Sequence, residues 1–182
     1  MVYVHLAEGF EEIEAVTIVD LLRRVGAEVK TVSVSGKKQV MGTHGMSVEA
    51  DLLYEEANYE ECEMIVLPGG MPGAENLGKH EGLTAHIRCF AEHGKYLAAI
   101  CAAPMVLGDL GILEGKKAVI YPGMEDRLKG AQAEQAKVIA DGTIITAKGP
   151  AAAMPFAIKL AEILKGKDAA KQLASDLLWE EK

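Results

Sequence analysis

The sequence predicts a layered α/β domain built around a mainly parallel β-sheet. Three observations point to this fold class. Short, continuously apolar segments recur along the chain, they alternate with segments whose apolar residues repeat at helical spacing, and 182 residues suffice for one domain with a substantial core. Strands that are apolar throughout are typical of parallel sheets covered by helices on both faces. We therefore expect a single domain over residues 1–182.

The first part of the chain has a β–α–β pattern. Residues 2–6 form an apolar run, and residues 11–25 show helical spacing of apolar side chains. Residues 29–34 are rich in β-branched residues and have the alternating pattern of a strand. Two arginines close the predicted helix, where they complement its dipole. A polar, glycine-containing stretch over residues 36–48 then predicts a hairpin or arm beside the main sheet.

The rest of the chain adds strands and helices in alternation. We expect strands at residues 64–67, 96–100 and 118–121, helices at residues 83–92 and 104–110, and a hairpin at residues 138–146 on an Asp-Gly turn. Pro150 can begin the next helix, but the ring of Pro155 opposes the carbonyl four residues earlier, so the helix either begins near Ala153 or bends. It ends near Gly166, and a last helix covers residues 168–179.

Composition and charge indicate a globular domain and argue against nucleic-acid-binding and membrane-spanning proteins. Hydrophobic residues make up 49% and charged residues 25% of the chain, which is usual for a globular domain. The net charge of −8 and the lack of a basic cluster argue against nucleic-acid binding. No apolar run approaches the roughly 20 residues that span a bilayer, and the chain opens without a signal-peptide pattern. We expect a cytoplasmic protein that binds neither nucleic acid nor a membrane.

Cys101 is the main candidate for a reactive residue. It directly follows the strand predicted at residues 96–100 and precedes Ala102, Ala103 and a helix that begins at Pro104, which is the arrangement of a nucleophile elbow. Because a helix N-terminus stabilises a thiolate, we expect a lowered thiol pKa. The alternative is a buried structural cysteine, which is the commoner case.

The other two cysteines, Cys62 and Cys89, lack that context, and we interpret both as structural. An odd cysteine count without a C-x-x-C pair argues against a disulfide framework and a zinc site. We expect neither a metal ion nor a cofactor. Among the five histidines, His44 in the glycine-rich arm is the one we expect to contact the site.

Two loops at the carboxyl ends of predicted strands offer partners for Cys101. Gly69 and Gly70 allow close approach of the backbone, and their N–H groups form a candidate oxyanion hole, although the segment is also compatible with a plain turn. In the other loop, Glu11 and Glu12 have the positions of dipole-complementing residues. Glu14 lies on a different helix face and is placed to share a proton with Cys101. Spacing alone does not select Glu14 over Glu11.

Four segments together resemble the ThiJ/PfpI superfamily, and within it the branch of the parkinsonism-associated protein deglycase and its bacterial relatives. They are residues 8–14, 66–77, 99–104 and 146–150, and they occur in the family's order over nearly the whole chain. The resemblance implies a flavodoxin-like three-layer sandwich of the class I glutamine amidotransferase type. It also implies a homodimer, for which we expect the helix at residues 11–25 and the arm to form the interface.

The same resemblance implies roles for individual residues. Cys101 would be the nucleophile, Glu14 the protonated carboxyl hydrogen-bonded to it, and Gly70 and Ala102 the donors of backbone N–H groups. The implied activity is glutathione-independent conversion of methylglyoxal or glyoxal to a hydroxy acid, or removal of their adducts from proteins. Because the cysteine of relatives oxidises to a sulfinic acid, a redox-sensing stress protein or chaperone is the alternative.

The chain departs from the family pattern at a few positions. Ala102 stands where the protease-like branch has the histidine that serves as base, which argues against a peptidase. Tyr121 stands where some relatives have a histidine, and Lys148 replaces an arginine. Relatives bring an arginine to the site across the dimer; the matching positions are Arg24, which is kept, and His44, which is changed. We expect Gly69, Tyr121, His44 and Arg24 near the substrate.

Overall fold

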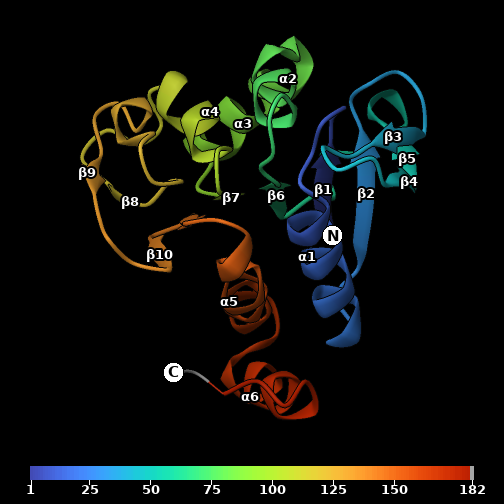
Figure 1. Cartoon of the computed structure of the whole chain (residues 1–182), viewed down its shortest axis with the longest axis vertical. Coiled ribbons are helices and arrows are strands. Elements are labelled where there is room, and N and C mark those ends of the chain that lie inside the picture. Colours follow the sequence, from blue (N-terminus) through green and yellow to red (C-terminus); the bar gives the residue numbers. More distant parts are fainter. Residues whose placement is uncertain (181–182) are drawn as a thin grey trace.

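A seven-stranded sheet forms the centre of the computed structural model, which describes residues 1–180 (Figure 1). Its order is β10–β11–β7–β6–β1–β2–β5, and only the β10–β11 pair is antiparallel. The strands are β1 (Val2–Leu6), β2 (Val29–Ser33), β5 (Leu52–Leu53), β6 (Met64–Leu67), β7 (Tyr96–Ile100), β10 (Val138–Asp141) and β11 (Ile144–Ala147). The predicted fold class, a layered α/β domain with a mainly parallel sheet, is confirmed.

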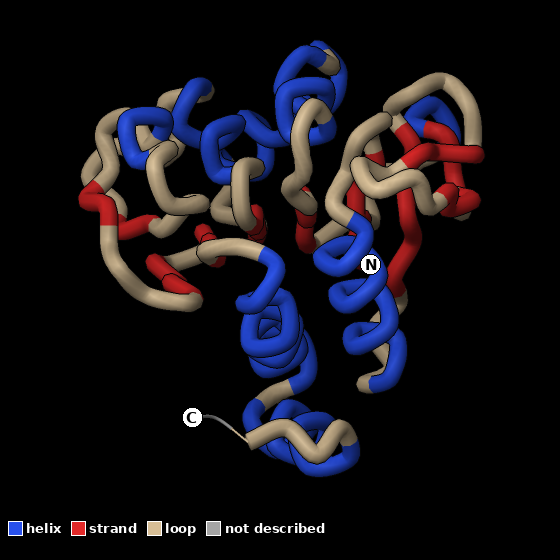
Figure 2. Tube along the Cα trace, viewed as in Figure 1, coloured by secondary structure: helices blue, strands red, loops and turns tan. Residues whose placement is uncertain are grey.

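Helices cover the sheet on both faces, as Figures 1 and 2 show. They are α1 (Glu12–Arg24), α2 (Gly73–Lys79), α3 (Glu81–Glu92), α4 (Pro104–Asp109), α5 (Ala153–Lys165) and α6 (Lys167–Asp176). The α2–α4 layer lies on one face, α1 and α5 lie on the other, and α6 packs on α5. A 3₁₀ turn over Pro150–Ala152 precedes α5, so the predicted start near Ala153 is confirmed.

Alternate residues of the central strands enter the two apolar layers. Ile65 and Leu67 of β6 belong to the core beneath α2–α4, whereas Met64 and Val66 belong to the core beneath α1 and α5. All four side chains are at most 1% exposed. Burial of each such side chain contributes about 1.5–3 kcal/mol to stability. This two-sided burial explains why β6 and β7 are apolar throughout.

The predicted arm is a small hairpin of β3 (Gln39–Met41) and β4 (Ser47–Glu49) beside the main sheet. It is joined to the segment before α1, because the Thr43 amide donates to the Phe10 carbonyl and the Gly9 amide donates to the Met41 carbonyl. The arm therefore places His44, at its turn, over the first turn of α1.

Some elements differ from the prediction. The strand predicted at residues 118–121 is wrong: only β8 (Lys117–Ala118) is extended, and it pairs with β9 (Gln132–Ala133) outside the main sheet. The reason is that the Val119 amide donates to the Thr146 side-chain hydroxyl instead of to the backbone carbonyl of a neighbouring strand. Helix α2 and the edge strand β5 were not predicted. In the described part of the chain, no helix combines the length and apolar character needed to cross a membrane.

Candidate active site

Cys101 sits at the point where β7 gives way to the turn before α4. Its φ angle is +65°, a left-handed conformation that is unusual for a residue with a side chain. Two hydrogen bonds hold this backbone: the Cys101 amide donates to the Ala147 carbonyl at 2.9 Å, and the Tyr121 amide donates to the Cys101 carbonyl at 2.8 Å. The strand–cysteine–helix geometry predicted for a nucleophile elbow is present.

Glu14, in the first turn of α1, is the carboxyl group beside this cysteine. Its side chain is fully buried, and Oε2 accepts a hydrogen bond from the Gly69 amide at 2.8 Å. Its other oxygen, Oε1, has no hydrogen-bond partner among residues 1–180. The Cys101 thiol is close enough to lower the Glu14 pKa, although the contact does not reach hydrogen-bond geometry. The structure thus brings Glu14, rather than Glu11, to Cys101.

Gly69 and Gly70 form the third wall of the site, and each position requires glycine. A Cβ on Gly69 would lie 2.6 Å from Cys101 Cβ and 2.8 Å from Glu14 Oε2. Gly70 has a φ angle of +88°, and a Cβ there would collide with the Glu11 amide nitrogen. The side-chain-free loop therefore lets the backbone approach the thiol, as the sequence predicts.

Burial sets the protonation of the pair. It raises the pKa of Glu14 to about 7, while the Gly69 amide acts in the opposite direction. Burial, followed by the charge of the Glu14 carboxylate, raises the pKa of Cys101 to about 12, and the backbone amides of Gly70 and Ala102 lower it. The prediction of a lowered thiol pKa is therefore wrong, because burial is the largest cause of the raised value. Helix α4 has only six residues, so its dipole does not outweigh burial.

Two residues predicted near the substrate differ in their placement. Tyr121 is half-exposed and its ring lies against Gly149, where a Cβ would come 3.3 Å from Cδ2. Its amide contacts Cys101, so it borders the site. Arg24 lies in the last turn of α1, ten residues or about 15 Å along the helix from Glu14. Its Nε donates to Asp20 at 2.8 Å, and within one chain it does not reach Cys101.

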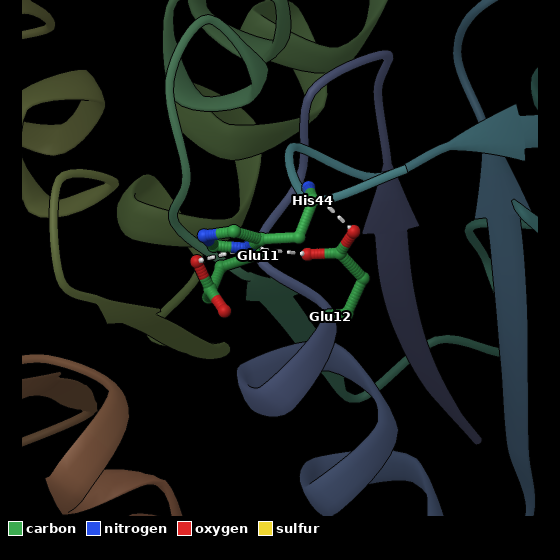
Figure 3. A group of neighbouring side chains, drawn as sticks. All are labelled: Glu11, Glu12 and His44. Carbon is green, nitrogen blue, oxygen red and sulfur yellow. Dashed lines mark hydrogen bonds and ion pairs between the residues drawn. The ribbon is translucent and has the colours of Figure 1, made fainter. Parts of the chain in front are cut away.

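His44 joins two acidic residues at the rim of the site (Figure 3). Its Nδ1 lies 3.1 Å from Glu12 Oε2 and 3.6 Å from Glu11 Oε2. Glu11 and Glu12 stand at the start of α1, where dipole-complementing residues are expected, but both are also buried and face His44, which that interpretation does not predict. Nothing in the local sequence reveals this contact, since the arm brings together residues 32 or 33 positions apart.

The two remaining cysteines differ in burial. Cys62 is buried, its thiol donates to the Met64 carbonyl at 3.2 Å, and burial raises its pKa to about 11, so its structural interpretation fits. Cys89 is exposed on α3, with Sγ 3.6 Å from His93 Nδ1. Its interpretation as a packing residue is wrong, because it lies on the solvent side of the helix.

Comparisons with known proteins give one consistent family. A family model described as the DJ-1/PfpI family matches residues 1–163. The chain is 39% identical over 180 residues to Protein DJ-1 homolog A of Arabidopsis thaliana, which covers 97% of this chain and 46% of that protein. It therefore spans less than half of that relative's length. It is 32% identical over 161 residues to a protein named deglycase PH1704 of Pyrococcus horikoshii, covering 87% of this chain and 96% of the relative.

The fold has a close counterpart among solved structures. A structure described as Toxoplasma gondii DJ-1, oxidized, superposes with a TM-score of 0.95 at 42% sequence identity, over 99% of this chain and 98% of that one. The likeness covers every element from β1 to α6 that positions the site. It confirms the flavodoxin-like sandwich that the four sequence segments imply.

Proposed function

Because the chain belongs to the DJ-1/PfpI family, we propose that it is a cysteine-dependent, cofactor-free enzyme acting on methylglyoxal-type α-oxoaldehydes or on their protein adducts. The observation that carries this proposal is the Cys101–Glu14 pair: a strained nucleophile elbow against a buried carboxyl whose pKa is raised to about 7. The name of the Pyrococcus relative, deglycase, supports the same class of reaction.

The first step joins the cysteine to the aldehyde. Transfer of the thiol proton to Glu14 gives a thiolate and a neutral carboxylic acid. The sulfur then forms a bond to the aldehyde carbon, and the carbonyl electron pair moves to oxygen, where the Gly70 and Ala102 amides stabilise the negative charge. Glu14 returns the proton to that oxygen, which gives a hemithioacetal. With its pKa raised to about 7, Glu14 occurs in both protonation states near neutral pH and can take and return the proton, whereas the Cys101 pKa of about 12 makes the transfer from the thiol uphill.

The second step is an internal oxidation–reduction. The proton on the former aldehyde carbon leaves, an enediol forms, and the neighbouring carbon is protonated, so the first carbon is oxidised and the second reduced. Water then attacks the resulting thioester, the carbon–sulfur bond breaks, and the 2-hydroxy acid leaves while the thiol regains its proton. Substrate plus water equals product, so no external oxidant or reductant is needed. For a protein adduct, the Cys101 sulfur bonds to the former aldehyde carbon, the bond from that carbon to the protein nitrogen or sulfur breaks, and the amine or thiol leaves with the proton that the Cys101 thiol gave up.

The test is methylglyoxal consumption by the wild type, Cys101→Ala and Glu14→Gln, with Cys89→Ser as the matched control. Cys101→Ala removes the nucleophile and is expected to abolish turnover. Cys89 lies exposed on α3, outside the site, so Cys89→Ser is expected to retain activity. Turnover that survives in both site variants would rule out this mechanism.

A redox-sensing or chaperone role is the second candidate. It is favoured by Glu14 Oε1, which is buried and has no hydrogen-bond partner among residues 1–180. When protonated, this carboxyl group can donate a hydrogen bond to an oxygen added to the neighbouring Cys101 sulfur. The solved Toxoplasma relative is described as oxidized. Mass spectrometry after mild peroxide treatment tests this role. Cys101 is expected to gain oxygen faster than Cys62 and Cys89, and an equal or slower rate excludes it.

Assembly and location complete the proposal. The exposed apolar side chains Ile13 and Val16 of α1 and Met41 and Met46 of the arm support a homodimer built on these two elements. A light-scattering mass of one chain at micromolar concentration would contradict it. All three cysteines are free, which supports a reducing compartment such as the cytoplasm.

A further inference from the structure

A group of three potential ligands lies beside the Cys101 site and has no part in the proposed reaction. Glu11 and Glu12 belong to the start of α1, and His44 belongs to the turn of the arm (Figure 3). We propose that these three side chains bind one divalent first-row transition-metal ion, of which Zn²⁺ is the representative, and that the ion holds the arm on α1.

The spacing of the three ligand atoms fits such an ion. A metal with bonds of about 2.0–2.2 Å separates neighbouring ligand atoms by about 3.0–3.6 Å. His44 Nδ1 lies 3.1 Å from Glu12 Oε2 and 3.6 Å from Glu11 Oε2, and the three ligand atoms lie within 4.8 Å of one another. An ion can therefore enter between them with only small side-chain movements.

Glu11 gives an independent reason to expect a cation. Its side chain is 9% exposed, yet within the described residues its carboxylate accepts no hydrogen bond, and the nearest cationic group, His44 Nδ1, is beyond hydrogen-bond distance at 3.6 Å. Glu11 is the N-cap residue of α1, but its side chain caps no amide. Burying a carboxylate is costly unless a positive charge or a donor lies close to it, and among the described residues the ion-pair partner of Glu11 is the exposed His44 imidazole at 3.6 Å. The carboxylate instead points toward His44, where a bound cation would neutralise it.

Glu12 is held in a ligand orientation by the arm. Its Oε1 accepts hydrogen bonds from the amides of His44 at 2.7 Å and Met46 at 3.3 Å, which leaves Oε2 directed at the imidazole. Gly42 provides the necessary space, because a Cβ there would collide with the Glu12 carboxylate. Hydrogen bonds of this kind around a ligand are the usual support for metal affinity.

The ligand set selects the class of ion. Two carboxylate oxygens and one imidazole nitrogen suit Zn²⁺, Mn²⁺, Fe²⁺ and Co²⁺, whereas Ca²⁺ takes six to eight oxygen ligands and Cu⁺ prefers sulfur. Two carboxylates with a neutral imidazole carry the charge of −2 that matches a divalent ion. In a single chain His44 is 68% exposed, so water can complete the coordination on the side away from the two glutamates.

The site is separate from the catalytic pair but adjacent to it. The Glu11 amide donates to the Gly69 carbonyl at 2.9 Å, and the Gly69 amide contacts Glu14. A bound ion would thus be linked to the Gly69–Gly70 loop through Glu11, without contacting the Cys101 thiol. This departs from the expectation of no metal, which rested on the odd cysteine count and the absence of a C-x-x-C pair. The three ligands proposed here come from two segments that are distant in the sequence.

Isothermal titration of the untagged, metal-free chain with zinc chloride tests the proposal. The work uses a Cys89→Ser background, because Cys89 and His93 form another pair of zinc-binding groups on α3. One ion per chain is expected to bind. Glu11→Gln and His44→Asn are expected to weaken zinc binding at least tenfold, since each removes one of three ligands. His93→Asn is the matched histidine control and is expected to leave the affinity within threefold.

Cys101→Ala distinguishes this site from one on the catalytic thiol. We expect it to bind zinc like the parent, and the Co²⁺-loaded parent to show no thiolate charge-transfer band. Loss of binding in Cys101→Ala, or such a band, would overturn the proposal. So would the absence of saturable binding, which is the result expected if a guanidinium of a second copy neutralises Glu11. His44→Asn changes an exposed side chain, so an unaltered circular dichroism spectrum shows that the variant is folded.

Discussion

Glu12 and Glu14 stand two residues apart in the first turn of α1 and face two different regions of the molecule. Both are almost completely buried, with 2% and 0% exposure. Burial raises the pKa of Glu14 to about 7. Burial also acts on Glu12, but hydrogen bonds from its own amide, His44 and Met46 outweigh it and lower the Glu12 pKa. Burial alone therefore does not decide whether a carboxyl group is charged.

The difference lies in the number of donors that each region supplies. The arm offers Glu12 two backbone amides and an imidazole, all of which stabilise its negative charge. The glycine loop offers Glu14 one amide, and its other oxygen accepts no hydrogen bond from residues 1–180. The arm side of α1 is thus built to hold a charge, and the Cys101 side is built to hold a proton.

The largest expected effect is on catalysis. Glu14→Gln cannot take or return a proton, so we expect kcat/KM for methylglyoxal to fall about 10²–10⁴-fold. Glu12→Gln changes a residue that does not face the thiol, and we expect less than a tenfold fall. Steady-state kinetics of the two variants measure the contrast. Equal losses in both variants would show that the two regions act as one site.

The next effect is the pH dependence of stability contributed by Glu14. Its pKa rises from an ordinary 4.5 to about 7 in the folded chain, so the unfolded state loses its proton first as the pH rises. The stabilising contribution is complete below about pH 4.5 and is lost as the pH rises through 7. Between pH 5 and pH 8 the wild type should therefore lose stability. We expect Glu14→Gln to lose about 2–3 kcal/mol less unfolding free energy than the wild type over this range.

Urea denaturation of the two proteins at pH 5 and pH 8 checks this expectation. Because the comparison is between two pH values of the same variant, any constant cost of burying the glutamine amide cancels. A wild-type stability that does not fall over this range would contradict the raised Glu14 pKa.

Glu12 is expected to show the opposite sign. Its folded pKa is lowered, so its contribution is present above the ordinary value of 4.5 and is lost as the pH falls through the folded pKa. In the presence of a chelator, we expect Glu12→Gln to lower the unfolding free energy at pH 7 by about 1–2 kcal/mol, since charged hydrogen bonds become neutral ones. The difference from wild type should shrink as the pH is lowered from 7 to below 4.5. Thermal unfolding followed by circular dichroism at both pH values measures it.

The contrast between these regions also shows what the sequence predicts well. Strands β6 and β7 are recognisable because two-sided burial makes every residue apolar, and Cys101 is recognisable because it directly follows such a strand. The fold and the nucleophile therefore follow from local patterns. The choice of Glu14 as its partner required the family resemblance, since periodicity alone left Glu11 open.

What the sequence does not predict depends on contacts between distant segments. His44 meets Glu12 only because the arm folds back over α1, and the raised thiol pKa depends on how deeply the finished structure buries Cys101. Helix α2 is hidden by its two glycines, of which Gly73 is needed because a Cβ would meet the Gly9 carbonyl at 2.6 Å. Local propensity carries none of this information.

The smallest expected effect tests whether the Glu12 and Glu14 sides of α1 are each formed by one chain alone. Arg24 is half-exposed, and its contact with Asp20 is a surface i,i+4 pair, which is worth at most about 0.5 kcal/mol. If one chain supplies the whole active site, Arg24→Ala changes the free energy of unfolding by no more than that amount. It also leaves kcat/KM for methylglyoxal unchanged, because the side chain lies about 15 Å along α1 from Glu14. A fall in kcat/KM that appears only at concentrations where light scattering shows a dimer would place the Arg24 of a second copy beside the site. Glu11 would then have a guanidinium as its partner, and the region that holds charge would belong to two chains instead of one.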